Sequence, residues 1–104
     1  MRYEELKDAI ENAKVNLSDM ACDVLDYVLD RYDETDEDID VDDVYDAVYE
    51  ECDSMFTYYS DAWDYLQDQC ITDFTEAIDN VGARDVCGIA YYYLEQEVLD
   101  NLCL

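Results

Sequence analysis

Residues 41 to 68 read VDDVYDAVYEECDSMFTYYSDAWDYLQD, and this stretch decides the fold that we expect. Its apolar side chains recur every three or four residues, which places them on one face of an α-helix. They are Val44, Tyr45, Val48, Cys52, Met55, Phe56, Tyr59, Trp63 and Leu66. The spacing predicts one long acidic central helix, or two nearly collinear helices with a break near residues 57 to 60.

The segments before this stretch follow the same helical period. A first helix is expected at residues 3 to 15, and a second from an N-cap at Ser18 to about Tyr32. We expect the inner face of the second helix to comprise Ala21, Val24, Leu25, Val28 and Leu29. An acidic connection, DETDEDIDVDD, leads from there into the central segment.

Two further helices are expected towards the C-terminus. Asp73 and Glu76 have the spacing of a capping box, which predicts a short helix that Gly82 ends. Asp85 is the predicted N-cap of the last helix, whose expected inner residues are Val86, Ile89, Ala90, Tyr93, Leu94, Val98 and Leu102. No stretch alternates as a strand does, so we expect an all-α fold, a single small compact domain over residues 1–104 with about four to five helices.

Composition agrees with a helical protein that folds. Half of the 104 residues are apolar, proline is absent, and only two glycines occur, so little in the sequence breaks a helix. The longest apolar runs fall far below the roughly 20 residues of a membrane span. The N-terminal residues MRYEELKDAI lack the apolar core of a signal peptide. We therefore expect a cytosolic protein with no membrane contact.

The residue types argue against catalysis and against a metal site. The chain has no histidine, and its five cysteines form no C-x-x-C pair, so we expect buried thiols rather than a redox or zinc site. An EF-hand calcium loop that begins at Asp36 would have Val41 where it requires glycine and Ala47 where it requires its last ligand, so the acidic connection does not match such a loop. The sequence also has no nucleophile motif and no glycine-rich phosphate loop. We expect no enzyme and no cofactor.

Charge is the strongest functional signal. Thirty acids against five bases give a net charge of −25, and the acids run through every expected helix. One stripe on the central segment comprises Asp42, Asp46, Glu50, Asp53, Asp61, Asp64 and Asp68, and the second helix carries Asp19, Asp23, Asp26 and Asp30. Like charges at this spacing destabilise a helix by about 0.2–0.5 kcal/mol per pair. Stability therefore does not explain them.

The total charge of the chain is similar to that of a short DNA duplex, whereas the stripe alone is sparser than duplex DNA. A continuous helix from Asp42 to Asp68 would be about 39 Å long, which is the length of about eleven base pairs. At the charge density of duplex DNA, 25 net charges correspond to about 43 Å. We also expect Tyr58 and Tyr65 to be displayed to a protein partner, and Tyr59 and Trp63 to face the core.

Several short motifs occur in order within residues 31 to 74: RYD at 31–33, the acidic connection, a helix start DDVYDA at 42–47, and YYSD at 58–61 followed by Ile71. Together they resemble the middle of the Ocr family of phage anti-restriction proteins. The resemblance implies an all-helical homodimer, shaped and charged like bent B-form DNA, that blocks Type I restriction-modification enzymes. It carries over, as phosphate surrogates, Asp33, Glu34, Asp36, Asp42, Asp43, Asp46, Asp53 and Asp61. The cysteines and the apolar NLCL end depart from that family.

These features predict a DNA-mimic inhibitor of a host defence enzyme, a Type I restriction-modification enzyme or similar, acting in the host cytoplasm if a phage encodes it. The alternatives are an anti-CRISPR protein that blocks DNA binding by a Cas complex, an acidic adaptor without DNA mimicry, and general acidity such as salt adaptation. We expect no direct contact with nucleic acid.

Residues 91–93 and the NLCL end either form a homodimer interface or pack within the monomer. The expected phosphate surrogates are Asp33, Glu34, Asp36, Asp38, Asp40, Asp42, Asp43, Asp46, Glu50, Asp53, Asp61, Asp64 and Asp68, and the expected aromatic contacts are Tyr58 and Tyr65.

Overall fold

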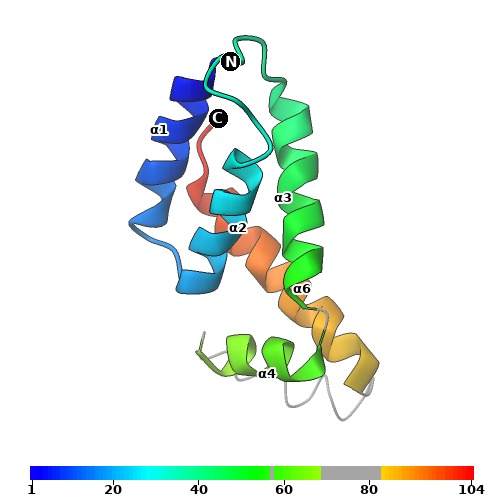
Figure 1. Cartoon of the computed structure of the whole chain (residues 1–104). Coiled ribbons are helices and arrows are strands. Elements are labelled where there is room, and N and C mark those ends of the chain that lie inside the picture. Colours follow the sequence, from blue (N-terminus) through cyan, green and yellow to red (C-terminus); the bar gives the residue numbers. More distant parts are fainter. Residues whose placement is uncertain (57, 69–82) are drawn as a thin grey trace.

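The computed structural model describes residues 1–56, 58–68 and 83–104, without the side chains of residues 59 and 83–85. These residues form five α-helices and no strand (Figure 1), which confirms the all-α fold. The helices are α1 (Tyr3–Lys14), α2 (Asp19–Leu29), α3 (Val41–Met55), α4 (Tyr59–Asp68) and α6 (Ala83–Asn101). The short helix predicted to start at Asp73 lies outside the described residues, as does Cys70.

The first three helices lie side by side along the length of the molecule, with α2 between α1 and α3 (Figure 1). The last helix, α6, runs diagonally behind them and contacts each of the other four described helices. The fourth, α4, packs mainly on α6 and crosses one end of the molecule. The N- and C-termini lie near each other at the opposite end.

The first two helices begin and end close to the predicted residues. Ser18 is the N-cap of α2, and its hydroxyl accepts a hydrogen bond from the Ala21 amide at 3.3 Å. The α-helix ends at Leu29, earlier than the predicted Tyr32, because the amides of residues 31 and 32 bond three residues back rather than four. The Arg31 amide donates to the Val28 carbonyl at 3.2 Å, and the Tyr32 amide donates to the Leu29 carbonyl at 3.1 Å.

The central segment contains two helices whose axes are not collinear. The predicted break near residues 57 to 60 is confirmed, because α3 ends at Met55 and α4 begins at Tyr59. The expectation of one long helix, or of two aligned ones, is wrong, because α4 lies across the lower end of α3 (Figure 1). The backbone of Phe56, at φ −113° and ψ 49°, is no longer helical. Its ring packs on the Tyr65 ring, with the two ring centroids 5.5 Å apart.

The core is formed by apolar residues from all five helices. Those of α6 fall four residues apart, on one stripe, at Val86, Ala90, Leu94 and Val98, and Leu102, just after the helix, continues this stripe. In α2, the predicted inner face is buried except for Leu29, which is half-buried. Two predictions on α6 are wrong: Tyr93 is 37% exposed, and Asp85 is not the N-cap because the helix already begins at Ala83.

The acidic connection between α2 and α3 is fixed to the N-terminal residues. The Met1 amino group donates to the Ile39 carbonyl at 2.7 Å, and the Ile39 amide donates to the Met1 carbonyl at 2.8 Å. The Tyr3 amide donates to the Asp36 carbonyl at 3.0 Å. Since the Ile39 side chain is also buried in the core, the connection presents its acids from a fixed backbone.

Candidate acidic partner-binding surface

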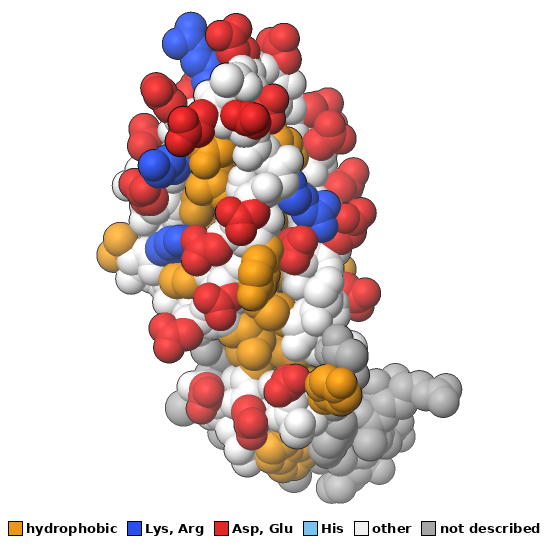
Figure 2. Space-filling view, in the orientation of Figure 1, with side chains coloured by type: hydrophobic (Ala, Val, Ile, Leu, Met, Phe, Trp, Pro, Cys, Tyr) orange, Lys and Arg blue, Asp and Glu red, His pale blue; other side chains and the backbone are white. Residues whose placement is uncertain are grey.

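The predicted phosphate surrogates lie at the surface in three groups. The connection carries Asp33, Glu34, Asp36, Asp38 and Asp40; α3 carries Asp42, Asp43, Asp46, Glu50 and Asp53; and α4 carries Asp61, Asp64 and Asp68. All are exposed except Asp36 and Asp61, which are half-buried. Figure 2 shows acidic side chains spread over α1, α2 and α3 on one face, with few basic ones among them.

The predicted single stripe from Asp42 to Asp68 does not exist as a continuous line. Because α3 and α4 are not collinear, the stripe divides into a row on α3 and a separate group on α4. The α3 row from Asp42 to Asp53 extends only about 16 Å. A second row lies on the neighbouring helix α2, where Asp19, Asp23, Asp26 and the C-cap residue Asp30 are all exposed. The acidic surface is therefore shorter than predicted but wider, because it has rows on two adjacent helices.

Three of the surrogates in the connection also hold its backbone. The Asp33 carboxylate accepts from the Thr35 amide at 3.2 Å, and the Asp36 carboxylate accepts from the Asp33 amide at 2.9 Å. Asp40 is the N-cap of α3 and accepts from the Asp42 amide at 2.9 Å. These bonds orient each carboxylate while leaving lone pairs for a partner.

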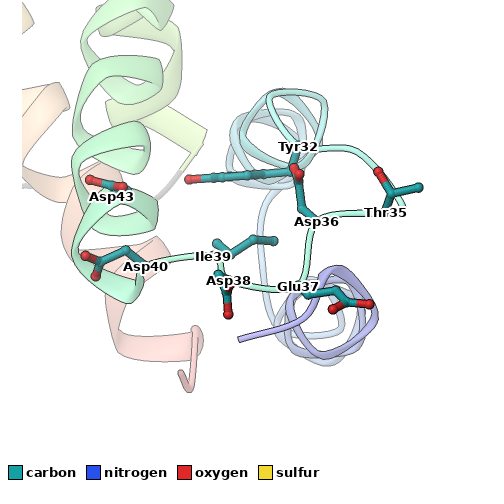
Figure 3. A pocket seen from close by; sticks show the side chains of 8 residues that line it. All are labelled: Tyr32, Thr35, Asp36, Glu37, Asp38, Ile39, Asp40 and Asp43. Atoms are coloured by element: carbon teal, nitrogen blue, oxygen red, sulfur yellow. The ribbon is translucent and has the colours of Figure 1, made fainter.

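The connection also lines a pocket of about 470 Å³ between α2 and α3. Its carboxylates come from Asp36, Glu37, Asp38, Asp40 and Asp43, and Tyr32 and Ile39 supply its apolar side. Figure 3 shows these carboxylates pointing apart along the chain rather than towards one point. Among the described residues, no three His, Cys, Asp or Glu side chains are grouped closely enough to hold a metal ion.

Among the bases whose side chains the structure describes, Lys14 and Arg31 form ion pairs between neighbouring helices. The Lys14 amino group, at the end of α1, binds the Asp26 carboxylate of α2. Arg31, just after α2, binds Glu50 and Glu51 of α3. Hydrogen bonds to the carboxylates raise the pKa of both cations, so both stay charged at neutral pH. Glu50, a predicted surrogate, is therefore partly neutralised from within the molecule.

Glu97 was not among the predicted site residues, although it joins three helices. The Ser18 hydroxyl donates to its carboxylate at 2.6 Å, and the Glu97 charge also acts on the Tyr65 hydroxyl of α4. Burial, with the Glu97 charge, raises the pKa of Tyr65 far above 10.0. The sequence signal was available, because Glu97 falls three residues after Leu94 and one before Val98, on the inner arc of α6.

The aromatic side chains separate into a buried set and a displayed set. Tyr58 is 69% exposed, as predicted, but Tyr65 is only 4% exposed, so its predicted display is wrong. Trp63 is half-buried against the core, in line with the prediction, and the side chain of Tyr59 is not described. Four further tyrosines are exposed in the described part of the chain: Tyr27 and Tyr49, which were not predicted as contacts, and Tyr92 and Tyr93, which belong to the segment 91–93 for which a homodimer interface was one of two expectations. Tyr27 could have been found, because it lies four residues after Asp23, away from the apolar arc of α2.

The cysteines and the C-terminal residues pack only partly as expected. Cys52 is buried, Cys22 and Cys87 are half-buried, and Cys103 is exposed, so the prediction of buried thiols is wrong for Cys103. Burial raises the pKa of Cys52 from 9.0 to about 12. Leu102 is buried and Leu104 packs against the core, so the apolar end packs within the monomer.

The charge is concentrated on a narrow body. The molecule measures 48 × 22 × 18 Å, so 25 net charges are distributed at one per about 1.9 Å of length, against about 1.7 Å in duplex DNA. In the described part of the chain, no helix is long and apolar enough to cross a membrane. No protein-family model, curated protein or solved structure matches this chain.

Proposed function

We propose that this protein is a DNA mimic that inhibits a host DNA-binding defence enzyme by occupying its DNA site. The observation that carries the proposal is the charge per length, one net negative charge per about 1.9 Å on a body 48 Å long. A lysine or arginine that binds phosphates in a duplex groove would meet carboxylates at a comparable density.

The fixed geometry of the carboxylates supports DNA mimicry rather than general acidity with unordered carboxylates. The row on α3 stands on a helix, and the carboxylates of the connection are oriented by backbone hydrogen bonds. When a basic groove neutralises a dense, rigid array of carboxylates, the counterions around that array are released, as those around DNA are, and the array needs little ordering when it binds. The exposed Tyr27, Tyr49 and Tyr58 would add hydrogen-bonding aromatic contacts between the charges.

The preferred target is a Type I restriction-modification enzyme, in line with the resemblance of residues 31–74 to the Ocr family. A Cas complex is the alternative target, because its basic channels hold nucleic acid through the same Arg and Lys contacts. Either way the protein acts stoichiometrically as a binder, without catalysis, cofactor or direct contact with nucleic acid.

We also propose that a second copy associates through α6. Residues 86–94 carry no acid, and Tyr92 and Tyr93, whose ring centroids lie 5.7 Å apart, are exposed there. Two chains of charge −25 repel each other least where acids are missing. Sedimentation equilibrium should give the mass of a dimer for the wild type and of a monomer for Tyr92→Glu. A wild-type monomer across the concentration range would contradict this association.

Titrated displacement of DNA tests the proposed inhibition. Labelled DNA bound to a Type I restriction-modification complex, and in parallel to a Cas effector, is mixed with increasing amounts of this protein. The proposal predicts release from one of the two complexes near one inhibitor per DNA site. DNA retained in both at large excess would remove both targets and leave the acidic-adaptor interpretation.

A further inference from the structure

Two rows of exposed carboxylates lie on α2 and α3, two helices that pack against each other, and we call this helix contact the α2–α3 border. The row on α2 includes Asp23 and Asp30, and the row on α3 includes Asp46 and Asp53 with Glu50 between them. Residues three and four apart share a helix face, so Asp46 and Asp53 lie on the same face of α3 as Glu50. Its contact with Arg31 places that row beside the C-terminal end of α2.

Arg31 makes three hydrogen bonds across this border. Its Nη1 donates to Glu50 Oε2 at 2.7 Å, while its Nε and Nη2 donate to Glu51 Oε1 at 3.1 and 2.7 Å. The guanidinium is planar and its donors are fixed, so it sets both the distance and the angle between the two partners. Arg31 itself is held by its amide, which donates to the Val28 carbonyl in the turn that ends α2.

Both rows are negatively charged, and the Arg31 guanidinium is a counter-charge at the contact between the two helices. Core packing between α2 and α3 fixes the helix axes, but the carboxylates stand on the solvent side of that contact. Glu51 has a side chain only 18% exposed, whereas that of Glu50 is 66% exposed. Arg31 thus bonds one sheltered carboxylate of α3 and one member of the exposed row.

We propose that Arg31 is a positioning residue, which holds the carboxylate rows of α2 and α3 at a fixed separation so that a basic partner meets both rows together. The inference rests on the proposed DNA mimicry, because it concerns how the same surface is arranged. A cation on this surface would by its charge alone weaken binding to a basic site. Arg31 instead strengthens that binding, because it orders the carboxylates around it.

Loss of a positive charge should therefore change DNA displacement in opposite directions at Arg31 and at a base without a positioning role. Arg31→Gln and Arg2→Gln each remove one positive charge, and Arg2 is an exposed residue just before α1, at the end of the molecule away from α4. DNA displacement from the target complex should tighten slightly for Arg2→Gln but weaken about two- to fivefold for Arg31→Gln. Arg31→Lys keeps the charge without the planar fork, and its displacement should fall between those of the wild type and Arg31→Gln.

A flexible polycation separates charge from arrangement. Deca-arginine adapts to any spacing, so it should bind both glutamine variants slightly more tightly than the wild type. Amide hydrogen exchange at residues 30 to 32 should be faster in Arg31→Gln than in the wild type, and unchanged in Arg2→Gln. Circular dichroism confirms that each variant is folded.

The outcomes distinguish this inference from the proposed function. If the two glutamine variants displace DNA equally well, or if exchange at residues 30 to 32 does not change in Arg31→Gln, Arg31 does not position the rows. If the wild type displaces no DNA from either complex, the proposed function fails. Exchange that is nonetheless faster in Arg31→Gln alone would then keep Arg31 as the residue that orders the α2–α3 border, without the mimicry.

Discussion

At the scale of single residues, neighbouring aromatic side chains take opposite roles. Tyr58 is displayed while Tyr65, seven residues later, is in the core beside Phe56. A continuous helix would have put Tyr65 outside its apolar stripe. The new helix α4 instead buries Ala62, Tyr65 and Leu66, which are spaced three and four residues apart on their own arc. The break before α4 therefore decides which tyrosine is available to a partner.

Substitution of these two tyrosines should separate stability from binding. Tyr65→Ala should lower the free energy of unfolding by roughly 3–5 kcal/mol, because it leaves a cavity beside Phe56 in the core. Tyr58→Ala should change that free energy by less than about 0.5 kcal/mol and weaken binding to the target. Urea denaturation measures both free energies. Equal losses of stability in the two variants would contradict the assignment.

The buried thiol predicts a loss of stability in alkali. Burial raises the pKa of Cys52 from 9.0 to about 12, so the folded state keeps a proton that the unfolded state releases. The resulting contribution is present in full below pH 9.0 and is lost as the pH rises towards about 12. Between about pH 8 and pH 10.5, the wild type should lose about 1–2 kcal/mol more stability than Cys52→Val. Identical losses in urea titrations at the two pH values would show that Cys52 is not responsible.

At the scale of elements, short-range signals decide where each helix begins, and contacts far apart in sequence decide how the helices are joined. Ser18 and Asp40 cap α2 and α3 through bonds to residues two or three positions ahead. In contrast, Ser18 meets Glu97 across 79 positions, and Arg31 meets Glu51 across 20. The same serine therefore serves its own helix and holds α6 against it.

Loss of the Ser18 hydroxyl should destabilise the protein through both of these contacts. Ser18→Ala removes the cap of α2 and a donor to the Glu97 carboxylate, and should lower the free energy of unfolding by about 1–2 kcal/mol. The melting temperature should fall by about 4–8 °C per kcal/mol for a domain of this size. Thr35→Ala, in the exposed connection, is the control and should leave the melting temperature almost unchanged. A similar fall in both variants would contradict the role of the cap.

Neutralising the α3 row should weaken binding while it stabilises the fold. Asp46→Asn with Asp53→Asn relieves repulsion along α3 and removes an anion from its C-terminal turn, so the free energy of unfolding should rise by about 0.5–1.5 kcal/mol. Glu5→Gln with Asp8→Asn removes the same charge from α1 and is the matched control for binding. DNA displacement should weaken more in the α3 variant. Equal weakening would mean that total charge, and not the α3 row, determines inhibition.

At the scale of the whole molecule, the sequence predicts the fold class and most of the core but not the shape of the acidic surface. Helical periodicity identifies the inner faces of α2 and α6, because burial follows a local repeat. It cannot give the direction of α4, which depends on Phe56 and on packing against α6. The charge count is likewise a property of composition. Its division into rows on α2, α3 and α4 is a property of the packing, and so is the neutralisation of Glu50 by Arg31.

DNA mimicry requires that this protein and DNA compete for one site on the target. The most direct test measures the apparent dissociation constant of the protein for its target enzyme at a series of DNA concentrations and at two salt concentrations. If the two compete, the constant should rise in proportion to free DNA, and binding should weaken in the higher salt. A constant that does not change with DNA, or a complex that holds both the protein and DNA, would contradict DNA mimicry.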